Sequence, residues 1–364
     1  MHSKHRYGCF CACLIIFLSA AADSRSGVID SISGEVQQVF EKAAPAIVKV
    51  RSTGGYRPLA GTGFFIDSEG ALLTSYEVVR DSPEVWIEYK AQKLQAKILG
   101  RDQRSGVALL KVDEHSTPYL PFGNSDAVRM ASGVIGIAYP YNLPLTPSFG
   151  WVKGFDVRYL NRFFATTHIR ASVDVSPGEI GGPLLNDKGE VVAMLVLAIQ
   201  DGKECYGLPI KAAGRIVADI KTYGYAKHGW VGVGVIEGQS SDAEPAQAVL
   251  VDSLYDNTPA STSGLKKGDQ VLSIGKHPVS DPRDILDAAF YSRIGESVPV
   301  KVLRNGKERL FAIKVVERPS SSNVVDRKIL EDPSSDGLTL PFVTEPGKQA
   351  VPNQVQPVRV NAHN

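Results

Sequence analysis

The sequence has 364 residues, of which 43% are apolar and 22% are charged, and its 40 Lys and Arg residues nearly balance its 39 Asp and Glu residues. This composition excludes a wholly disordered chain and a generally basic nucleic-acid-binding protein. No apolar run reaches 18 residues, which excludes a protein with several membrane spans. The length predicts two or three domains.

The first 22 residues have the pattern of a secretory signal peptide. Lys4 and Arg6 provide a positive start, and Cys9 to Ala22 form an almost unbroken apolar stretch that ends in small residues. We expect this segment to be cleaved and the protein to be exported, periplasmic or extracellular, with no stable membrane span afterwards. Retention of the segment as an N-terminal anchor is the alternative. Cys205 is the only cysteine beyond it, so no internal disulfide is expected and this thiol is predicted to be buried and inert.

The chain that follows is rich in short strand patterns. An N-terminal segment over residues 23–45 contains a short helix, predicted from Gly34 to Ala44 by the spacing of its apolar residues. Residues 46–226 carry many short apolar runs without long helices between them, which is typical of antiparallel β-barrels or sandwiches. A closing helix is predicted over Lys211–Tyr223. The predicted strands of this part are Ala46–Arg51, Gly63–Asp67, Val85–Tyr89, Ala96–Leu99, Val107–Val112, Gly133–Ala138, Ile169–Val173, Val191–Leu197 and Tyr206–Ile210.

Residues 229–318 are predicted to be a separate, small α+β unit. Its single helix begins after Ser280 or Asp281 as N-cap, has Pro282 in its first turn and runs to about Ser292. Residues 319–364 hold six prolines and one aromatic residue, a composition that predicts a flexible tail. The predicted strands of the α+β unit are Val231–Val235, Ala248–Val251, Gln270–Ile274, Val298–Leu303 and Leu310–Val315.

Six motifs follow one another along the chain: Ala43–Val50, Gly61–Asp67, Leu72–Val79, Gly106–Val112, Leu120–Asp126 and Pro177–Leu185. The residues of these motifs and their order along the chain resemble the HtrA (Deg) family of secreted trypsin-like serine proteases, in which a PDZ domain follows the protease domain. The resemblance covers roughly Val36 to Pro319. It implies a mainly β fold: a trypsin-like double β-barrel, with the site in the crevice between the barrels, followed by a small α+β PDZ domain.

The resemblance also implies where a catalytic triad would lie. The family's histidine ends a Thr-x-x-His stretch, and that position is Glu77 here. The family's aspartate position is Gly106, and its serine position is Ile180. Isoleucine has no nucleophilic atom, glycine has no side chain, and a glutamate with an ordinary pKa of about 4.3 is a weak base at neutral pH. The catalytic set is therefore predicted to be empty and hydrolysis by this route absent.

The loop around position 180 keeps the glycines that allow a tight turn. By the resemblance, the backbone N–H groups of Gly178 and Ile180 lie where the family has its oxyanion donors. Two interpretations of Ile180 stay open: a residue freed from constraint, or an apolar plug that fills the crevice or helps to hold a peptide. Glu77 and Glu179 could form a carboxylate pair, but Glu179 is expected on an exposed turn. The histidines show no metal-ligand spacing, and neither a metal nor a cofactor is predicted.

The unit over residues 229–318 resembles a PDZ domain through Trp230–Val233 and Gly264–Asp269. Such a domain binds a peptide as an additional strand beside a helix, and its backbone N–H groups hold the terminal carboxylate. The alternative is that the same residues only form a core. The peptide-binding residues implied are Trp230, Val231, Gly232, Val233 and Val235 on the strand side, with Ile285 and Ala289 on the helix.

Together these features predict an exported, catalytically inactive HtrA-like protein that binds protein C-termini or unfolded polypeptide through its PDZ domain. One alternative is a serine-type hydrolase that uses non-standard residues. Another is a regulatory subunit that joins active relatives in mixed trimers. The family's trimers also make a homotrimer an expected assembly, and no nucleic-acid partner is expected.

Overall fold

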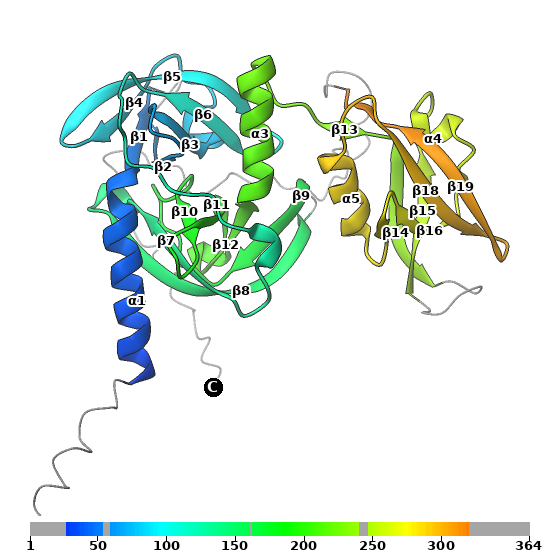
Figure 1. Cartoon of the computed structure of the whole chain (residues 1–364), viewed down its shortest axis with the longest axis horizontal. Helices are drawn as coiled ribbons and strands as arrows, with labels where there is room; N and C mark the ends of the chain where they lie inside the picture. Colours follow the sequence, from blue (N-terminus) through cyan, green and yellow to red (C-terminus); the bar gives the residue numbers. More distant parts are fainter. Residues whose placement is uncertain (1–26, 54–58, 161, 240–246, 320–364) are drawn as a thin grey trace, which may run out of the picture.

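The computed structural model describes residues 27–53, 59–160, 162–239 and 247–319. The predicted signal peptide and the predicted tail beyond residue 319 lie outside these ranges. The fold is mainly β: two closed antiparallel barrels of six strands each, followed by a separate α+β unit (Figure 1). This arrangement confirms the predicted fold class. Within the described ranges, no helix combines the length and the apolar character needed to cross a bilayer.

The first barrel closes in the strand order β1-β2-β3-β6-β5-β4. Its strands β2 and β3 are buried along most of their length because they face both the barrel interior and the second barrel. A single turn of helix, α2 (Tyr76–Val79), follows β3 at the crevice. The strands are β1 (Ile47–Ser52), β2 (Leu59–Phe65), β3 (Ala71–Ser75), β4 (Val85–Tyr89), β5 (Gln92–Asp102) and β6 (Val107–Lys111).

The second barrel closes in the order β10-β11-β12-β9-β8-β7 and contains one long strand that the sequence did not predict. Strand β8 has no continuous apolar run, and it includes Gly150, where a Cβ would lie 2.3 Å from Ser172 O. This close approach of two backbones explains the glycine, which otherwise weakens a strand pattern. The strands are β7 (Gly133–Ala138), β8 (Thr146–Tyr159), β9 (Arg162–Ala171), β10 (Pro183–Leu185), β11 (Val191–Ile199) and β12 (Glu204–Pro209).

Two helices pack against the barrels. Helix α1 (Val28–Ala43) begins six residues before the predicted start at Gly34. The prediction missed these first turns because they are exposed and carry no buried apolar face that would appear as a periodic pattern in the sequence. Helix α3 (Ile210–Tyr223) matches the predicted closing helix and ends at Gly224, whose φ of +83° is the left-handed conformation that a helix C-terminus favours. Short 3-10 turns connect other elements: η1 (Ala44–Ala46), η2 (Ser125–Ala127), η3 (Pro140–Asn142) and η4 (Gln200–Gly202).

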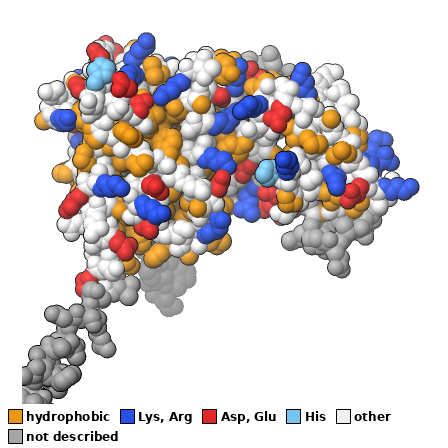
Figure 2. Space-filling view, viewed as in Figure 1, with side chains coloured by type: hydrophobic (Ala, Val, Ile, Leu, Met, Phe, Trp, Pro, Cys, Tyr) orange, Lys and Arg blue, Asp and Glu red, His pale blue; other side chains and the backbone are white. Residues whose placement is uncertain are grey.

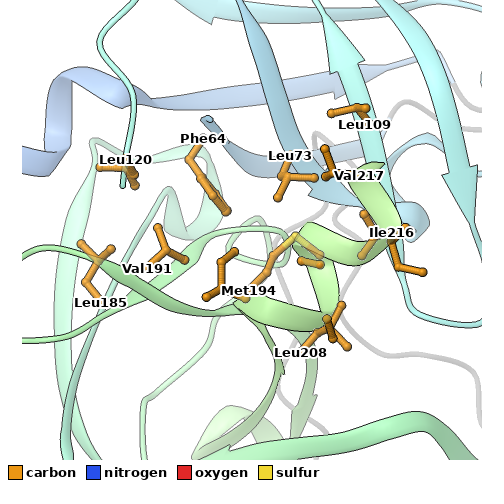
Figure 3. Packing of buried hydrophobic residues seen from close by; sticks show 14 of the residues in the cluster. Phe64, Leu73, Leu109, Leu120, Leu185, Val191, Met194, Leu208, Ile216 and Val217 are labelled. Carbon is orange, nitrogen blue, oxygen red and sulfur yellow. The ribbon is translucent and has the colours of Figure 1, made fainter. Parts of the chain in front are cut away.

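A buried apolar cluster lies where the two barrels and α3 meet. Figure 3 shows Phe64 and Leu73 of the first barrel pointing toward Met194 and Leu208 of the second, with Ile216 of α3 beside them. All five side chains belong to the buried core. Burial of this apolar surface holds the barrels together and so fixes the walls of the crevice.

The α+β unit is built on one antiparallel sheet with the order β14-β15-β16-β18-β19, and β17 pairs with β16. Helix α5 (Pro282–Tyr291) lies beside β14, with Asp281 as N-cap as predicted (Figure 1). A second short helix, α4 (Pro259–Thr262), was not predicted. The strands are β13 (Gly229–Trp230), β14 (Val233–Gln239), β15 (Gln247–Leu254), β16 (Gln270–Ile274), β17 (His277–Pro278), β18 (Ser297–Arg304), β19 (Lys307–Lys314) and β20 (Val316–Glu317).

Helix α5 docks on the second barrel through Asp287. The Asp287 carboxylate accepts hydrogen bonds from the Thr166 hydroxyl and from both the backbone N–H (2.8 Å) and the hydroxyl (2.8 Å) of Thr167 on β9. Arg283 adds a hydrogen bond to Phe155 O (2.9 Å) on β8.

On the face drawn in Figure 2, both charge signs are interspersed with hydrophobic side chains, as the balanced composition implies.

Removal of the Asp287 carboxylate should loosen this docking. Asp287→Ala leaves the Thr167 N–H without its acceptor, so we expect the free energy of unfolding to fall by about 1–3 kcal/mol and trypsin to cleave faster at Lys227 in the connecting segment. Urea denaturation and timed trypsin digestion measure both effects. Asp252→Ala, which removes a partly exposed carboxylate paired with Lys267, is the control. An unchanged cleavage rate in Asp287→Ala would contradict the docking role.

Candidate functional site

The three positions assigned to a triad lie together at the crevice between the barrels. Glu77 is the second residue of α2, and the N–H of its neighbour Tyr76 donates to Gly106 O (2.8 Å). The loop that carries Ile180 packs on the end of β3, since a Cβ on Gly181 would lie 2.7 Å from Ser75 N. The structure therefore brings these segments of both barrels into one site.

At this site, the side chain of Glu77 pairs with an arginine of its own helix. Its Oε2 atom lies 3.1 Å from Arg80 Nη1, one helical turn away. The N–H of Glu77 donates to the Ser75 hydroxyl (3.2 Å), which caps the short helix. The carboxylate at the family's base position is thus held by a guanidinium group.

At Gly106 the backbone itself has a shape that opposes a side chain. Its φ is +76°, the left-handed region, where L-residues with a Cβ are strained. A Cβ placed there would make only ordinary van der Waals contact with Val196, at 3.4 Å and 3.5 Å, so space for a side chain is present. The backbone conformation therefore favours glycine, and an aspartate at this position would be strained.

Ile180 packs into the second barrel. Its side chain is 8% exposed and belongs to the buried cluster that includes Val173, Leu195 and Cys205. Most of its apolar surface is thus used in the core, which leaves little of it for the crevice. This packing makes Ile180 a residue of the barrel core and argues against the interpretation as a plug.

Thr62 on β2 ties the loop of residues 178–182 to the first barrel. Its N–H donates to Ile180 O (3.0 Å), and its hydroxyl donates to Gly178 O (2.8 Å). The Thr74 hydroxyl donates to Thr62 O (2.8 Å), which braces the same strand. Gly181 has φ +91°, and a Cβ there would lie 2.3 Å from Thr62 O. Sequence analysis missed both threonines, whose only signal is their place in the Gly61–Asp67 and Leu72–Val79 motifs.

The same loop retains two backbone donors. Pro177 O accepts from Tyr141 N (2.6 Å), and Glu179 O accepts from a later N–H of the loop (3.0 Å). A trans peptide places its C=O and N–H on opposite sides, so these bonds direct the N–H groups of Gly178 and Ile180 away from the residues that donate to the two carbonyl groups. Over the described ranges, neither N–H donates a hydrogen bond. The loop therefore keeps two unengaged donors at the positions that the resemblance assigned to an oxyanion site.

Glu179 is buried, which corrects the expectation of an exposed turn. Its side chain turns into the protein, the residue is 5% exposed, and its carboxylate accepts a hydrogen bond from Ser176 N. Burial, together with the negative charge of Asp174, raises the pKa of Glu179 to about 7 although the Ser176 hydrogen bond opposes the shift. Cys205 is also fully buried, as predicted, and burial raises its pKa to about 12.

Three histidines have partners outside the crevice site. His115 Nδ1 lies 3.1 Å from a Glu69 carboxylate oxygen on the surface. His228 Nε2 lies 2.9 Å from Asp102 Oδ2 between the barrels and the α+β unit. His168 is buried and stacks on Phe164, with Nδ1 2.7 Å from a backbone carbonyl.

Among the residues that the structure describes, no group of three or more His, Cys, Asp or Glu side chains could hold a metal ion.

A second candidate site is an apolar cavity between β14 and α5. It is lined by Val231, Val233 and Val235 on the strand side and by Ile285 and Ala289 on the helix. These five are predicted peptide-binding residues that the structure brings together. The sequence missed Ala288 and Ser292, which also line the cavity and lie on the same helical face.

The loop before β14 has a fixed backbone. Val231 O accepts from Ala260 N (2.9 Å) and Gly232 O accepts from Tyr255 N (3.0 Å). Gly232 has φ +80°, and a Cβ there would lie 2.3 Å from Thr258 Cβ. The carbonyl groups thus face α4 and its neighbours, so the N–H groups that follow them point to the opposite side. Trp230 packs beside Tyr255 with the ring centroids 5.8 Å apart and the rings tilted by 44°, and it does not line the cavity.

Comparison with known proteins agrees with this two-part architecture. The trypsin-like peptidase domain family matches residues 61–194, and the PDZ domain family matches residues 229–315. A Pseudomonas putida protein named "Probable periplasmic serine endoprotease DegP-like" is 33% identical over 270 residues, 71% of this chain. A Pseudomonas fluorescens protein of the same name is 29% identical over 79% of this chain. The chain is therefore similar in sequence to these DegP-like proteins across both its trypsin-like and its PDZ part.

Solved structures support the fold. The HtrA-type protease AlgW with tripeptide superposes with a TM-score of 0.70 at 24% identity, covering 79% of this chain and 99% of that one. The serine endoprotease from Yersinia pestis gives a TM-score of 0.60 at 22% identity, covering 78% and 98%. The chain spans only 56% and 62% of the lengths of the two Pseudomonas relatives.

Glu179 should make the stability of the protein depend on pH. Its pKa is raised from an ordinary 4.5 to about 7, so the folded state binds this proton more tightly. The contribution of this difference to the free energy of unfolding is fully present below pH 4.5 and is lost as the pH rises through 7. The whole contribution is roughly 3 kcal/mol. Glu179→Gln, which keeps an acceptor for Ser176 N, should therefore be more stable than the wild type at pH 8 and similar at pH 5.

Urea denaturation at both pH values measures this difference. Glu84→Gln, which changes an exposed glutamate, serves as the matched control and should give no gain at pH 8. Equal free energies of unfolding for the wild type and Glu179→Gln at pH 8 would contradict the buried carboxylate's role.

Proposed function

We propose that this chain is an exported, catalytically inactive HtrA-type protein that binds apolar protein C-termini or unfolded polypeptide through its PDZ groove. The observation that carries the proposal is the pairing of an apolar cavity between β14 and α5 with a crevice at which the positions assigned to the triad hold Glu77, Gly106 and Ile180. Periplasmic localisation is part of the proposal and is supported by the names of the Pseudomonas relatives.

The chemistry of the crevice supports inactivity. Loss of a single triad member lowers the rate of such enzymes by about 10⁴- to 10⁶-fold. Here the nucleophile position holds a buried aliphatic side chain and the aspartate position is a left-handed glycine. Glu77 is paired with Arg80, and the residue at position 180 carries no hydroxyl or thiol for it to activate.

The geometry of the groove supports peptide binding. Strand β14 is the edge of its sheet, so its outer backbone groups can pair with an added strand. The cavity beneath it is lined by apolar side chains that suit an apolar terminal residue. AlgW, a structural relative, was solved with a tripeptide. We assign Val231, Val233, Val235, Ile285 and Ala289 to peptide contact, and Trp230 and Gly232 to support of the carboxylate-binding loop.

Proteolysis is the competing function. The curated relatives are named serine endoproteases, and the Gly178 and Ile180 N–H groups remain available to a developing oxyanion. Glu179, with a pKa of about 7, is the carboxylate best suited to act as a base in such an enzyme. A homotrimer, or a mixed trimer that regulates active relatives, stays compatible with either function.

An activity assay separates the two functions. We expect the purified chain from residue 23 onward to leave unfolded casein uncleaved and to show no stoichiometric labelling by a serine-reactive phosphonate. Gel electrophoresis and mass spectrometry measure both. Cleavage that disappears in Glu77→Gln or Glu179→Gln would overturn the proposal of inactivity and establish a non-standard hydrolase.

Peptide binding should require the groove and a free carboxylate. We expect a labelled peptide ending in Val to bind the full mature chain by fluorescence anisotropy, and its C-terminal amide to bind at least about tenfold more weakly. Ala289→Leu, which fills the cavity, should weaken binding by a similar factor. Leu310→Ala, on the opposite edge strand, should leave it unchanged. Equal binding of acid and amide would contradict carboxylate recognition.

A further inference from the structure

The crevice loop contains a buried carboxylate without a cationic partner. Glu179 is 5% exposed, and over the described ranges its carboxylate accepts a hydrogen bond only from Ser176 N of the same loop. The ionisable groups whose charges interact with it are the exposed Asp174 of its own segment and the buried Cys205 thiol of β12, and neither is a cation. In such surroundings an ionised carboxylate is unfavourable, whereas a protonated one is tolerated.

Two glycines bracket Glu179 and Ile180. Gly178 has φ +97° and Gly181 has φ +91°, a region that glycine adopts at little cost. Over the described ranges, the one backbone hydrogen bond from the two bracketed residues to another element joins Thr62 N–H to Ile180 O (3.0 Å). Few bonds must therefore break for this segment to leave the second barrel, so it can open locally while both barrels stay folded.

Glu179 and Ile180 leave the barrel together because they are consecutive and both side chains are buried. Ile180 belongs to the same buried apolar cluster as Cys205. Movement of Glu179 into water therefore carries Ile180 toward the crevice and removes cover from the Cys205 thiol. It also releases the N–H groups of Gly178 and Ile180 from their fixed directions.

We propose that Glu179 is a proton-operated latch: its neutral carboxyl keeps residues 178–181 closed on the second barrel, and its ionisation releases them. This inference concerns the crevice and does not rest on the function of the groove. The pKa of Glu179 is about 7 in the closed loop against an ordinary 4.5, which the open loop restores. The closed form is therefore favoured most below pH 4.5 and loses this preference as the pH rises through 7.

Cys205 reports the open loop because it is the only cysteine after residue 22. We expect methyl methanethiosulfonate to label it, in the purified chain from residue 23 onward, from the open form in which the thiol is solvated. The ratio of the labelling rates of the wild type and Glu179→Gln at one pH cancels the intrinsic reactivity of the thiol. This ratio should rise by at least about tenfold from pH 5 to pH 8. Peptide mapping by mass spectrometry measures both rates.

Glu84→Gln, which changes an exposed glutamate, is the matched control. The ratio of the wild type to this variant should stay the same at both pH values. A ratio of the wild type to Glu179→Gln that also stays the same would overturn the latch.

A second buried thiol separates loop opening from unfolding of the whole protein. Ala96→Cys introduces one in the core of the first barrel, where Ala96 is 5% exposed. In this variant at pH 8, Cys205 should be labelled at least about tenfold faster than the introduced thiol, which only unfolding exposes. Equal labelling of the two thiols would overturn the latch, and this comparison needs no change at Glu179.

Discussion

The packing of the two barrels against one another is the constraint on which the crevice depends. Phe64 and Leu73 from the first barrel share one buried cluster with Met194 and Leu208 from the second. The crevice loops extend from strands that are fixed in this cluster, so their backbones are positioned by apolar burial. Phe290 of α5 belongs to the same cluster, and Arg215 of α3 lies over its ring at 4.6 Å. The PDZ helix is therefore part of the same packed core.

This constraint explains how the crevice loops keep their positions. The loop of residues 178–182 is held by backbone bonds and by the Thr62 hydroxyl. Glu77, Gly106 and Ile180 satisfy local needs: an ion pair with Arg80, a left-handed turn and barrel packing. Fold similarity to proteases therefore reports on the backbone and does not by itself decide activity.

Sequence patterns predicted those elements whose signals are local. Asp281 before Pro282 gave the start of α5, because an N-cap carboxylate and an N1 proline act within one turn. Strand β8 could not be predicted because Gly150 is dictated by a contact with Ser172, which is distant in the chain. The placement of Glu179 was wrong for a similar reason. Its carboxylate is buried by the tertiary fold, and nothing in the residues beside it signals that burial.

The groove residues could be predicted because one short helix and one strand carry them at regular spacing. Ile285 and Ala289 are four residues apart and line the cavity together. The dual use of α5 could not be predicted, since it appears only when the domains are docked. Asp287 and Phe290 leave the same helix toward the barrels, where they bond to β9 and enter the inter-barrel cluster.

A helix shared in this way couples the groove to the barrels. Asp287 bonds to Thr166 and Thr167 on the barrel side of α5, whereas Ile285 and Ala289 of the same helix line the cavity on its other side. The docking contacts and the cavity wall therefore belong to one rigid element. Any change in how α5 sits on the barrels also moves one wall of the cavity.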